Sequence, residues 1–370
     1  MKVLISINTA WNLVNFRAGL IRALIKAGHE VVAAAPPDAY VERVRALGCR
    51  FVPLPMDNKG TNPIRDLLLL IRFIRLMRRE RPDVYLGYTV KPNVYGSIAA
   101  NLCGISVINN IAGLGSVFVR NDWLTRLVRR LYALALSRSA TVFFQNEDDR
   151  AQFIEGGLVN RKITDRLPGS GVDLSRFEVA PMPSAAAPIR FLLIARMLWE
   201  KGVGEYVEAA RQLRRLGLNA EFCLLGFLDV QNPAAINREQ MAQWCAEGFV
   251  IYLGETDDVA SQIAAASCVV LPSYYREGVP RSLLEAAAMG RPIITTDAVG
   301  CREVVDDGVN GYLCKPRDAN DLALKMRQMS ELPASARSEM GRQGRQKMER
   351  EFDEKIVIGK YLEAIAAISR

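Results

Sequence analysis

The sequence has 370 residues, half of them hydrophobic and 24% charged, which is enough apolar material for two domains with their own cores. The seven cysteines are scattered without a C-x-x-C pair, which excludes a disulfide framework and a zinc site and indicates reduced, buried thiols. No apolar run approaches the roughly 18–20 residues that span a bilayer, and the first apolar stretch is too short for a signal peptide. We therefore expect a cytoplasmic protein whose membrane contact is peripheral.

The net charge of +8 is concentrated in one half of the chain. Residues 1–180 contain 25 Lys and Arg against 15 Asp and Glu, a net charge of +10, whereas the remaining residues contain 23 against 25, a net charge of −2. A basic half predicts an anionic partner, which is a nucleic acid, a lipid surface or a phosphorylated substrate.

The first half alternates apolar strands with amphipathic helices. In chain order we expect strand Lys2–Ile7, helix Val14–Ala27, strand Val31–Ala35, helix Tyr40–Leu47, strand Phe51–Leu54, helix Pro63–Arg79, strand Val84–Tyr88, helix Val94–Cys103, and strands Val107–Ile111, Val142–Gln145 and Ile163–Leu167. Strands that alternate with helices across short loops predict a parallel sheet covered on both faces.

Ala180–Pro188 is rich in proline and small residues, which is typical of a linker, and the alternation restarts after it. Here we expect strand Arg190–Ile194, helix Gly204–Leu216, strands Ala220–Leu225 and Val250–Leu253, helix Asp258–Ala265, strand Cys268–Leu271, helix Ser282–Met289, strand Pro292–Thr296 and a last helix Glu354–Ser369. The sequence thus predicts an α/β protein with two Rossmann-like, doubly wound domains facing across a cleft, formed by residues 1–180 and 189–353 with a linker at 181–188.

Neither predicted domain has the glycine-rich loop of a dinucleotide site. That loop requires G-x-G-x-x-G directly after a strand, where the backbone approaches a pyrophosphate. The first strand is followed by Asn8–Asn12 and the strand of the second half by Ala195–Trp199, without such glycines. A nicotinamide enzyme is therefore excluded.

Two carboxylates follow a buried strand in the second half. A loop carries Glu277 and Gly278, a helix begins near Pro280, and Glu285 lies about one turn into that helix. The helix N-terminus suits a phosphate, and a carboxylate can accept two hydroxyl hydrogen bonds from a sugar. The alternative is that neither carboxylate binds a ligand. Glu277 is then an ordinary loop residue, and Glu285 complements the helix dipole.

Two cations follow the first strand of the same half. Arg196 and Lys201 are placed at the carboxyl end of that strand, where a planar guanidinium and a compact ammonium suit a diphosphate. As an alternative, both are solvated charges that flank a turn.

These segments closely resemble the group 1 retaining glycosyltransferases of GT-B fold, which carry an E-x7-E signature. The resemblance rests on Ala195–Gly202, Leu271–Tyr274, Glu277–Pro280, Leu283–Ala286, Tyr252–Gly254, Gly300–Val304 and Asp307–Tyr312, and in the first half on Asn15–Arg17, Lys91–Gly96, Ile111–Phe118 and Gly169–Asp173. Within the family the chain looks most like the N-acetylgalactosaminyltransferases that extend undecaprenyl-diphosphate-linked N,N′-diacetylbacillosamine.

The resemblance implies a set of donor-site roles. Glu285 would bind ribose hydroxyls, Glu277 the donor sugar, the amides of Gly278 and Val279 the sugar and phosphate, and Arg196 and Lys201 the diphosphate. We expect Glu277, Arg196 and Lys201 to act in catalysis on a UDP-sugar. The acceptor, a polyprenyl-diphosphate-linked sugar, is expected near Arg17, Lys91, Gly113 and Gly115. The resemblance also implies that residues 354–370 cross back onto the N-terminal domain.

The chain departs from the family at two places. Its only histidine is His29, in a turn between a helix and a strand, so no histidine base is expected in the site. Asn8–Trp11 replaces the common Gly-Gly loop. With no D-x-D sequence in the chain, and with Glu147–Asp149 opening a helix as caps, we expect no metal and no cofactor.

Alternative functions are a nucleotide-sugar epimerase on the same fold, a glycosyltransferase with a soluble acceptor, and a nucleic-acid-binding protein. An epimerase needs acid–base groups around the sugar, for which a chain with one peripheral histidine is poorly equipped. The basic half lacks the interleaved aromatic residues of a base-stacking platform, so no nucleic-acid partner is expected.

Two basic, apolar segments in the first half raise the question of membrane contact. Ile64–Arg81 has more apolar residues than a core-facing stripe needs and ends in clustered arginines, and Leu124–Leu131 repeats the pattern. Each is either a packed helix with a solvated basic face or an interfacial membrane helix. The repetition favours peripheral binding to the anionic cytoplasmic face of the inner membrane.

Overall fold

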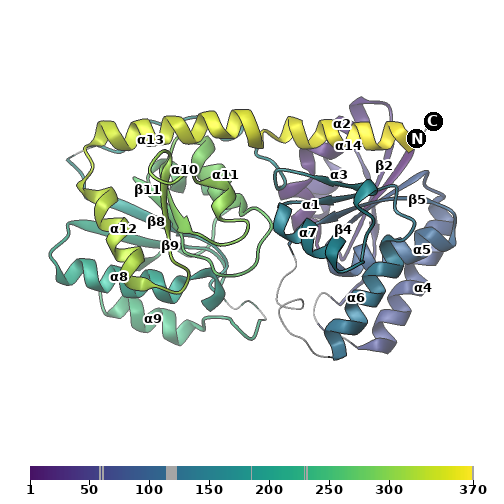
Figure 1. The fold of residues 1–370 in the computed structure, drawn as a ribbon, viewed down its shortest axis with the longest axis horizontal. Helices are drawn as coiled ribbons and strands as arrows, with labels where there is room; N and C mark the ends of the chain where they lie inside the picture. Colours follow the sequence, from purple (N-terminus) through teal and green to yellow (C-terminus); the bar gives the residue numbers. More distant parts are fainter. Residues whose placement is uncertain are drawn as a thin grey trace. The chain divides into compact units, whose positions relative to one another are not determined.

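The computed structural model describes residues 1–57, 60, 62–113, 123–184, 186–228, 230 and 232–368. The chain forms two compact units, one made of Met1–Ser170 with Glu354–Arg370 and the other of Gly171–Asp353. Figure 1 shows their helices and strands, many of them labelled.

The first unit is built on a parallel sheet with the strand order β3-β2-β1-β4-β5-β6-β7. Its strands are β1 Lys2–Ser6, β2 Glu30–Ala35, β3 Arg50–Pro53, β4 Val84–Tyr88, β5 Ser106–Ile111, β6 Thr141–Phe144 and β7 Thr164–Arg166. Its helices are α1 Ala10–Phe16, α2 Ala18–Lys26, α3 Val41–Arg45, α4 Pro63–Glu80, α5 Ser97–Leu102, α6 Trp123–Leu136, α7 Glu147–Glu155 and α14 Glu354–Ile368, with a π-helical turn at Pro92–Gly96.

Helices cover both faces of this sheet, because successive strand side chains point to opposite sides. Val3 and Ile5 of β1 share a core with α2 and α14, whereas Leu4 packs into a second core with Leu69 and Phe73 of α4. The continuous apolar strands of the sequence are those of a sheet buried on both sides.

Helix α14 comes last in the chain and completes the core of this unit. Tyr361 is 1% exposed, its ring lies 5.0 Å from that of Phe143, and its hydroxyl accepts a 2.8 Å hydrogen bond from Asn110 Nδ2. Figure 1 shows α14, in yellow, running beside α2.

The single helix predicted over Val14–Ala27 is wrong. The structure has α1 and α2, separated at Arg17, whose φ of −130° and ψ of 1° are not helical. Helix α1 begins earlier than expected because the Thr9 side chain accepts a 3.0 Å hydrogen bond from the Asn12 amide and caps it.

The second unit is also a parallel sheet, with the strand order β10-β9-β8-β11-β12-β13. Its strands are β8 Ile189–Ile194, β9 Ala220–Leu225, β10 Ile251–Tyr252, β11 Cys268–Leu271, β12 Ile293–Thr296 and β13 Gly311–Cys314. Its helices are α8 Val203–Arg215, α9 Arg238–Ala246, α10 Val259–Ala264, α11 Arg281–Ala288, α12 Ala319–Glu331 and α13 Ala334–Lys347. Elements α9, β13, α12 and α13 were not predicted. The two parallel-sheet α/β units confirm the predicted fold class.

The second unit begins at Gly171, whereas the sequence predicts a boundary at residue 180. The buried guanidinium of Arg291 explains why Gly171–Pro181 belongs to it. Arg291 donates hydrogen bonds to the carbonyls of Ala180 and Pro181 at 2.9 and 2.7 Å, and to those of Ile263 and Ala264. Burial lowers the pKa of Arg291 to about 10, and its planar donors fix the segment to α10.

Across the described part of the chain, none of the helices has the length and apolar character to span a bilayer.

Candidate functional site

The predicted donor residues lie at the carboxyl ends of two neighbouring strands. β8 and β11 pair in parallel, with Cys268 opposite Phe191. The turn that contains Arg196 and Lys201 therefore leaves the sheet beside the loop that contains Glu277. In open α/β sheets this edge is where ligands bind.

The turn and the loop are held together by backbone contacts. Gly202 has a φ of 75°, and a β-carbon there would lie 2.1 Å from the Pro272 carbonyl oxygen, so only glycine fits. The amides of Tyr274 and Tyr275 each donate a 3.1 Å hydrogen bond to the Glu200 carbonyl. The spacing of the two segments is thus fixed without any ligand.

Lys201 and Glu277 form an ion pair in this site. Their side chains are 11% and 14% exposed, and Lys201 Nζ contacts Glu277 Oε1. The Ser273 hydroxyl donates a 2.8 Å hydrogen bond to the same carboxylate oxygen. Lys201 Nζ also lies 5.6 Å from the centre of the Tyr275 ring, a cation–π distance. The structure thus places a buried ammonium and a fixed carboxylate together.

The second carboxylate, Glu285, has its own basic partner. Arg281 Nε donates a 2.9 Å hydrogen bond to Glu285 Oε1, and the two side chains are 13% and 14% exposed. Burial raises the pKa of Glu285, and the charges of Arg281 and Arg176 offset this in part. Glu285 is therefore held in one orientation on α11.

The N-terminus of α11 carries no side-chain cap. Its N-cap position is Pro280, whose side chain has no hydroxyl or carboxylate with which to cap the helix. Gly278 and Val279 are buried directly before it. This is the geometry that accepts an anion at a helix start.

A second loop supports Glu277 and Gly278 from the side of β12. Gly300 has a φ of 84°, and a β-carbon there would lie 1.6 Å from the Gly278 carbonyl oxygen. Cys301 is fully buried next to this contact, and burial raises the pKa of its thiol to about 12. The thiol stays protonated and acts as packing.

Arg196 differs from Lys201 in its surroundings. It is exposed, and within the described part of the chain its side chain has no hydrogen-bond or ion-pair partner. The structure thus leaves its guanidinium accessible to solvent near the end of β8.

The residues predicted to bind the acceptor lie in the first unit. Arg17 is 5% exposed, its guanidinium lies 4.1 Å from the centre of the Tyr88 ring, and its Nε has no hydrogen-bond partner among the described atoms. Lys91 pairs with Asp66 Oδ1 of α4 at 2.7 Å. Gly113 has a φ of 105° just after β5, and Gly115 lies outside the described residues.

Sequence reasoning missed two residues that position the carboxylates. Arg281 was detectable, because it precedes Glu285 by four positions on a helix and such pairs face each other. Ser273 was not detectable, because serine is common in loops and only the fold brings its hydroxyl to Glu277.

In the described part of the chain, no group of three or more His, Cys, Asp and Glu side chains is placed to hold a metal ion. The expectation that no metal takes part stays a prediction.

Two family models match the chain, one in each half. Residues 15–165 match the family described as glycosyl transferase 4-like domain, and residues 188–331 match the family described as glycosyl transferases group 1.

Individual relatives cover most of the chain. It is 29% identical to the N,N′-diacetylbacillosaminyl-diphospho-undecaprenol alpha-1,3-N-acetylgalactosaminyltransferase of Campylobacter jejuni, over 95% of this chain and 94% of that protein. It is 24% identical to the UDP-Gal:alpha-D-GlcNAc-diphosphoundecaprenol alpha-1,3-galactosyltransferase of Escherichia coli, over 76% and 73% of the two chains.

Solved structures share the fold. The structure of Anabaena Alr3699/HepE in complex with UDP superposes with a TM-score of 0.79 and 18% identity, covering 99% of this chain and all of that one. With both halves matched to glycosyltransferase families and the whole chain matched in fold, the protein belongs to the group 1 glycosyltransferases of GT-B fold.

Proposed function

We propose that this glycosyltransferase moves a sugar, an N-acetylhexosamine, from a UDP-sugar to a polyprenyl-diphosphate-linked sugar in bacterial glycan assembly. The C. jejuni relative is named for an N-acetylgalactosamine transfer to a diphospho-undecaprenol-linked sugar, and the E. coli relative for a UDP-galactose donor. Alr3699/HepE was solved with UDP bound. These names support the donor and acceptor classes.

One observation carries the proposal: Lys201, Glu277 and Ser273 form a fixed cluster at the ends of β8 and β11, directly before the uncapped start of α11. The barrier to transfer is the departure of a dianionic diphosphate from an oxocarbenium-like carbon. Lys201, Arg196 and the first amides of α11 supply positive charge for that leaving group, and preorganised charge of this kind is usually the largest catalytic contribution.

The two carboxylates recognise the donor by hydrogen bonding. Glu277, oriented by Lys201 and Ser273, accepts hydrogen bonds from the sugar, and Glu285, oriented by Arg281, accepts those of the ribose. When the diphosphate arrives, Lys201 shares its donors between Glu277 and phosphate oxygens.

We propose that transfer occurs with retention. The acceptor hydroxyl attacks the anomeric carbon from the face that the diphosphate leaves, so that one C–O bond breaks and another forms on the same face. The hydroxyl proton passes to a phosphate oxygen of the departing UDP. No histidine or other protein base is needed, and the positive charges of Lys201 and Arg196 take the place of a metal ion.

The acceptor side and the location belong to the same proposal. In this proposal Arg17, Lys91, Gly113 and Gly115 contribute to binding the acceptor, and the reaction takes place at the cytoplasmic face of the inner membrane. Among the described atoms the buried Nε of Arg17 has no hydrogen-bond acceptor, and an oxygen of the sugar acceptor would supply one.

Purified protein tests the proposal in a UDP-release assay with UDP-hexoses and UDP-N-acetylhexosamines, with and without a polyprenyl-diphosphate-sugar acceptor. We expect UDP only when the acceptor is present, an α-linked product by NMR, and an unchanged rate in EDTA. Lys201→Ala and Glu285→Gln should each lower kcat by about 100-fold or more, as loss of a charged group at a developing charge does.

The matched control is Lys315→Ala, which removes an exposed lysine of the same unit and should keep full activity. Unchanged turnover of folded Lys201→Ala would refute the site. UDP release without acceptor would favour the epimerase, and activity lost in EDTA and restored by Mg²⁺ would refute metal independence.

A further inference from the structure

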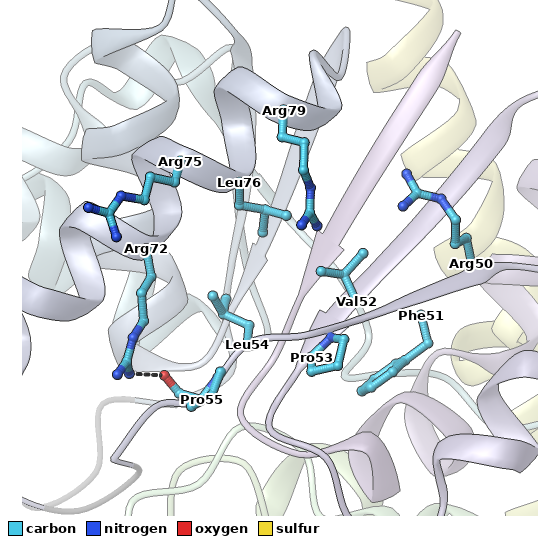
Figure 2. A pocket seen from close by; sticks show the side chains of 10 residues that line it. All are labelled: Arg50, Phe51, Val52, Pro53, Leu54, Pro55, Arg72, Arg75, Leu76 and Arg79. Atoms are coloured by element: carbon cyan, nitrogen blue, oxygen red, sulfur yellow. Dashed lines mark hydrogen bonds between the residues drawn. The ribbon is translucent and has the colours of Figure 1, made fainter.

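A basic groove lies on the first unit between α4 and β3. Its volume is about 500 Å³. β3 is the edge strand of its sheet, and the chain after it turns through Pro53 and Pro55. In Figure 2 the guanidinium group of Arg72 extends from α4 to the carbonyl of Pro55, that of Arg79 extends toward β3, and Arg50 lies across the groove.

The positive charge of this groove is only partly neutralised. Arg50 and Arg79 both donate to the buried Glu80 carboxylate, and Arg72 donates a 2.7 Å hydrogen bond to the uncharged carbonyl of Pro55. The side chain of Arg75 has no hydrogen-bond or ion-pair partner among the described residues.

Other charged side chains near the groove do not neutralise its excess of positive charge. Lys2 also contacts Glu80 and is itself paired with Glu30. Among the described residues that line the groove or bond to its arginines, four guanidiniums thus face one carboxylate. The side chains of Arg50 and Arg79 are 49% and 64% exposed, so the surplus is open to solvent.

The first turns of α4, before its groove arginines, carry exposed apolar side chains. Ile64, Leu67 and Leu68 are 72%, 59% and 47% exposed at the beginning of α4. Positions 64, 68, 72, 75 and 79 fall within one face of a helix, since residues three and four apart lie side by side. This exposed face is therefore apolar in its first two turns and basic in its last two.

We propose that the groove binds the phosphate head groups of an anionic lipid surface while the apolar start of α4 enters the hydrocarbon boundary. Charge complementarity argues for phosphate, and the exposed aliphatic side chains on the same face argue for lipid rather than RNA. Among the residues lining the groove, the aromatic side chain is Phe51, which is 7% exposed and unavailable for base stacking. Pro53 on the edge strand disfavours a peptide that adds as a strand.

This inference deepens the proposed function, because a transferase with a polyprenyl-linked acceptor must work at a membrane. It also restricts lipid binding to one surface of one unit. Neutralising the groove should therefore weaken membrane attachment and leave the donor site of the other unit intact.

Vesicle co-sedimentation of the full chain tests it, with vesicles of phosphatidylcholine alone and of phosphatidylcholine mixed with phosphatidylglycerol. We expect binding only to the anionic vesicles, and release at high salt, because lipid surface charge is screened within the Debye length. The triple variant Arg72→Gln, Arg75→Gln, Arg79→Gln should bind at least tenfold more weakly. Replacing the same arginines by lysine should retain most of the binding, and Leu67→Ser with Leu68→Ser should weaken it.

The matched control neutralises three exposed arginines of the second unit, Arg327, Arg342 and Arg350, whose side chains are 58%, 54% and 64% exposed. It changes the net charge equally and should bind vesicles like the wild type. Any one of three results would overturn the proposed lipid site. These are an equal loss of vesicle binding in the control, no binding of the wild type at low salt, and tighter binding to single-stranded RNA than to anionic vesicles.

A transfer assay with a short-chain, water-soluble acceptor separates the two proposals. The groove variant should turn over this acceptor at the wild-type rate. Vesicle binding without transfer would refute the proposed function alone, whereas transfer without vesicle binding would refute the groove alone.

Discussion

At the scale of single residues, Glu277 and Glu285 each have a fixed basic partner, Lys201 for the first and Arg281 for the second. A carboxylate that is already oriented loses little conformational freedom when it binds a hydroxyl. Under the proposed function, the pairs would therefore position both carboxylates before the donor binds. Their precision depends on the loops that carry them, above all on the contact between Gly300 and Gly278.

Gly300→Ala tests that contact. The added β-carbon would lie 1.6 Å from the Gly278 carbonyl oxygen at a φ of 84°, so the Glu277 loop must move. We expect the free energy of unfolding to fall by about 3 kcal/mol, from backbone strain and overpacking together. The rate of sugar transfer should fall by more than the loss of folded protein accounts for. Urea denaturation and the UDP-release assay measure the two effects.

Gly308→Ala is the matched control, because Gly308 has a φ of 74° but open space around its α-carbon. It should lose only about 1 kcal/mol to backbone strain and keep its activity. Equal losses in the two variants would show that the Gly300 contact has no special part in holding Glu277.

At the scale of elements, Glu80 joins α4 to β1 and β3. Its side chain is 4% exposed and contacts Arg50, Arg79 and Lys2. Hydrogen bonds from Arg50 lower the pKa of Glu80 from 4.5 to about 2, against the effect of burial. A carboxyl whose folded pKa is lowered stabilises the fold above its unfolded pKa, and this contribution is lost as the pH falls toward the folded value.

Glu80→Gln should therefore destabilise the first unit on the order of 1–3 kcal/mol at neutral pH, because three cations lose their common partner. The difference from the wild type should shrink as the pH falls below 4.5 and vanish near 2. Thermal unfolding followed at several pH values measures it. Glu42→Gln breaks an exposed pair with Arg45 and should change stability by less than about 0.5 kcal/mol at any pH. A pH-independent loss in Glu80→Gln would contradict the linkage.

Most strands could be predicted because parallel strands buried on both faces are short apolar runs between turns, as in Val84–Tyr88. The break between α1 and α2 could not, because Thr9 and Arg17 become a cap and a junction only through backbone geometry. α13 has a largely polar sequence, so it shows no strong apolar stripe by which to recognise it.

In the site, too, some features could be predicted from sequence and others could not. Glu277, Glu285 and Lys201 were predicted from sequence, because they follow strands and lie in recognisable motifs. The Lys201–Glu277 pair joins residues 76 positions apart, and spacing alone cannot reveal it. The arginines of α4 were recognised as a basic segment, whereas the groove that they form with Arg50 of β3 was not, because Arg50 lies far from them in sequence.

At the scale of the molecule, the first unit is discontinuous in sequence, because Glu354–Arg370 belongs to it. Tyr361→Ala should cost this unit about 3–5 kcal/mol through the cavity it leaves, and Tyr361→Phe about 1 kcal/mol through the lost bond with Asn110. Hydrogen–deuterium exchange should show faster exchange in β5 and β6 and no change in β8, β11 and β12. The exposed Glu363→Ala on the same helix is the control. Unchanged protection of β5 and β6 would show that α14 is dispensable.

The place of α14 also sets an order of events during synthesis. A ribosome completes Met1–Ser170 first, yet that segment lacks Val357 and Tyr361, which fill its core. Gly171–Asp353 is continuous and is fully translated before α14 exists. The half of the protein that is made first is therefore finished last, and until then the nascent chain exposes the apolar surface that α14 will cover. Such a surface is where a chaperone would bind the growing chain.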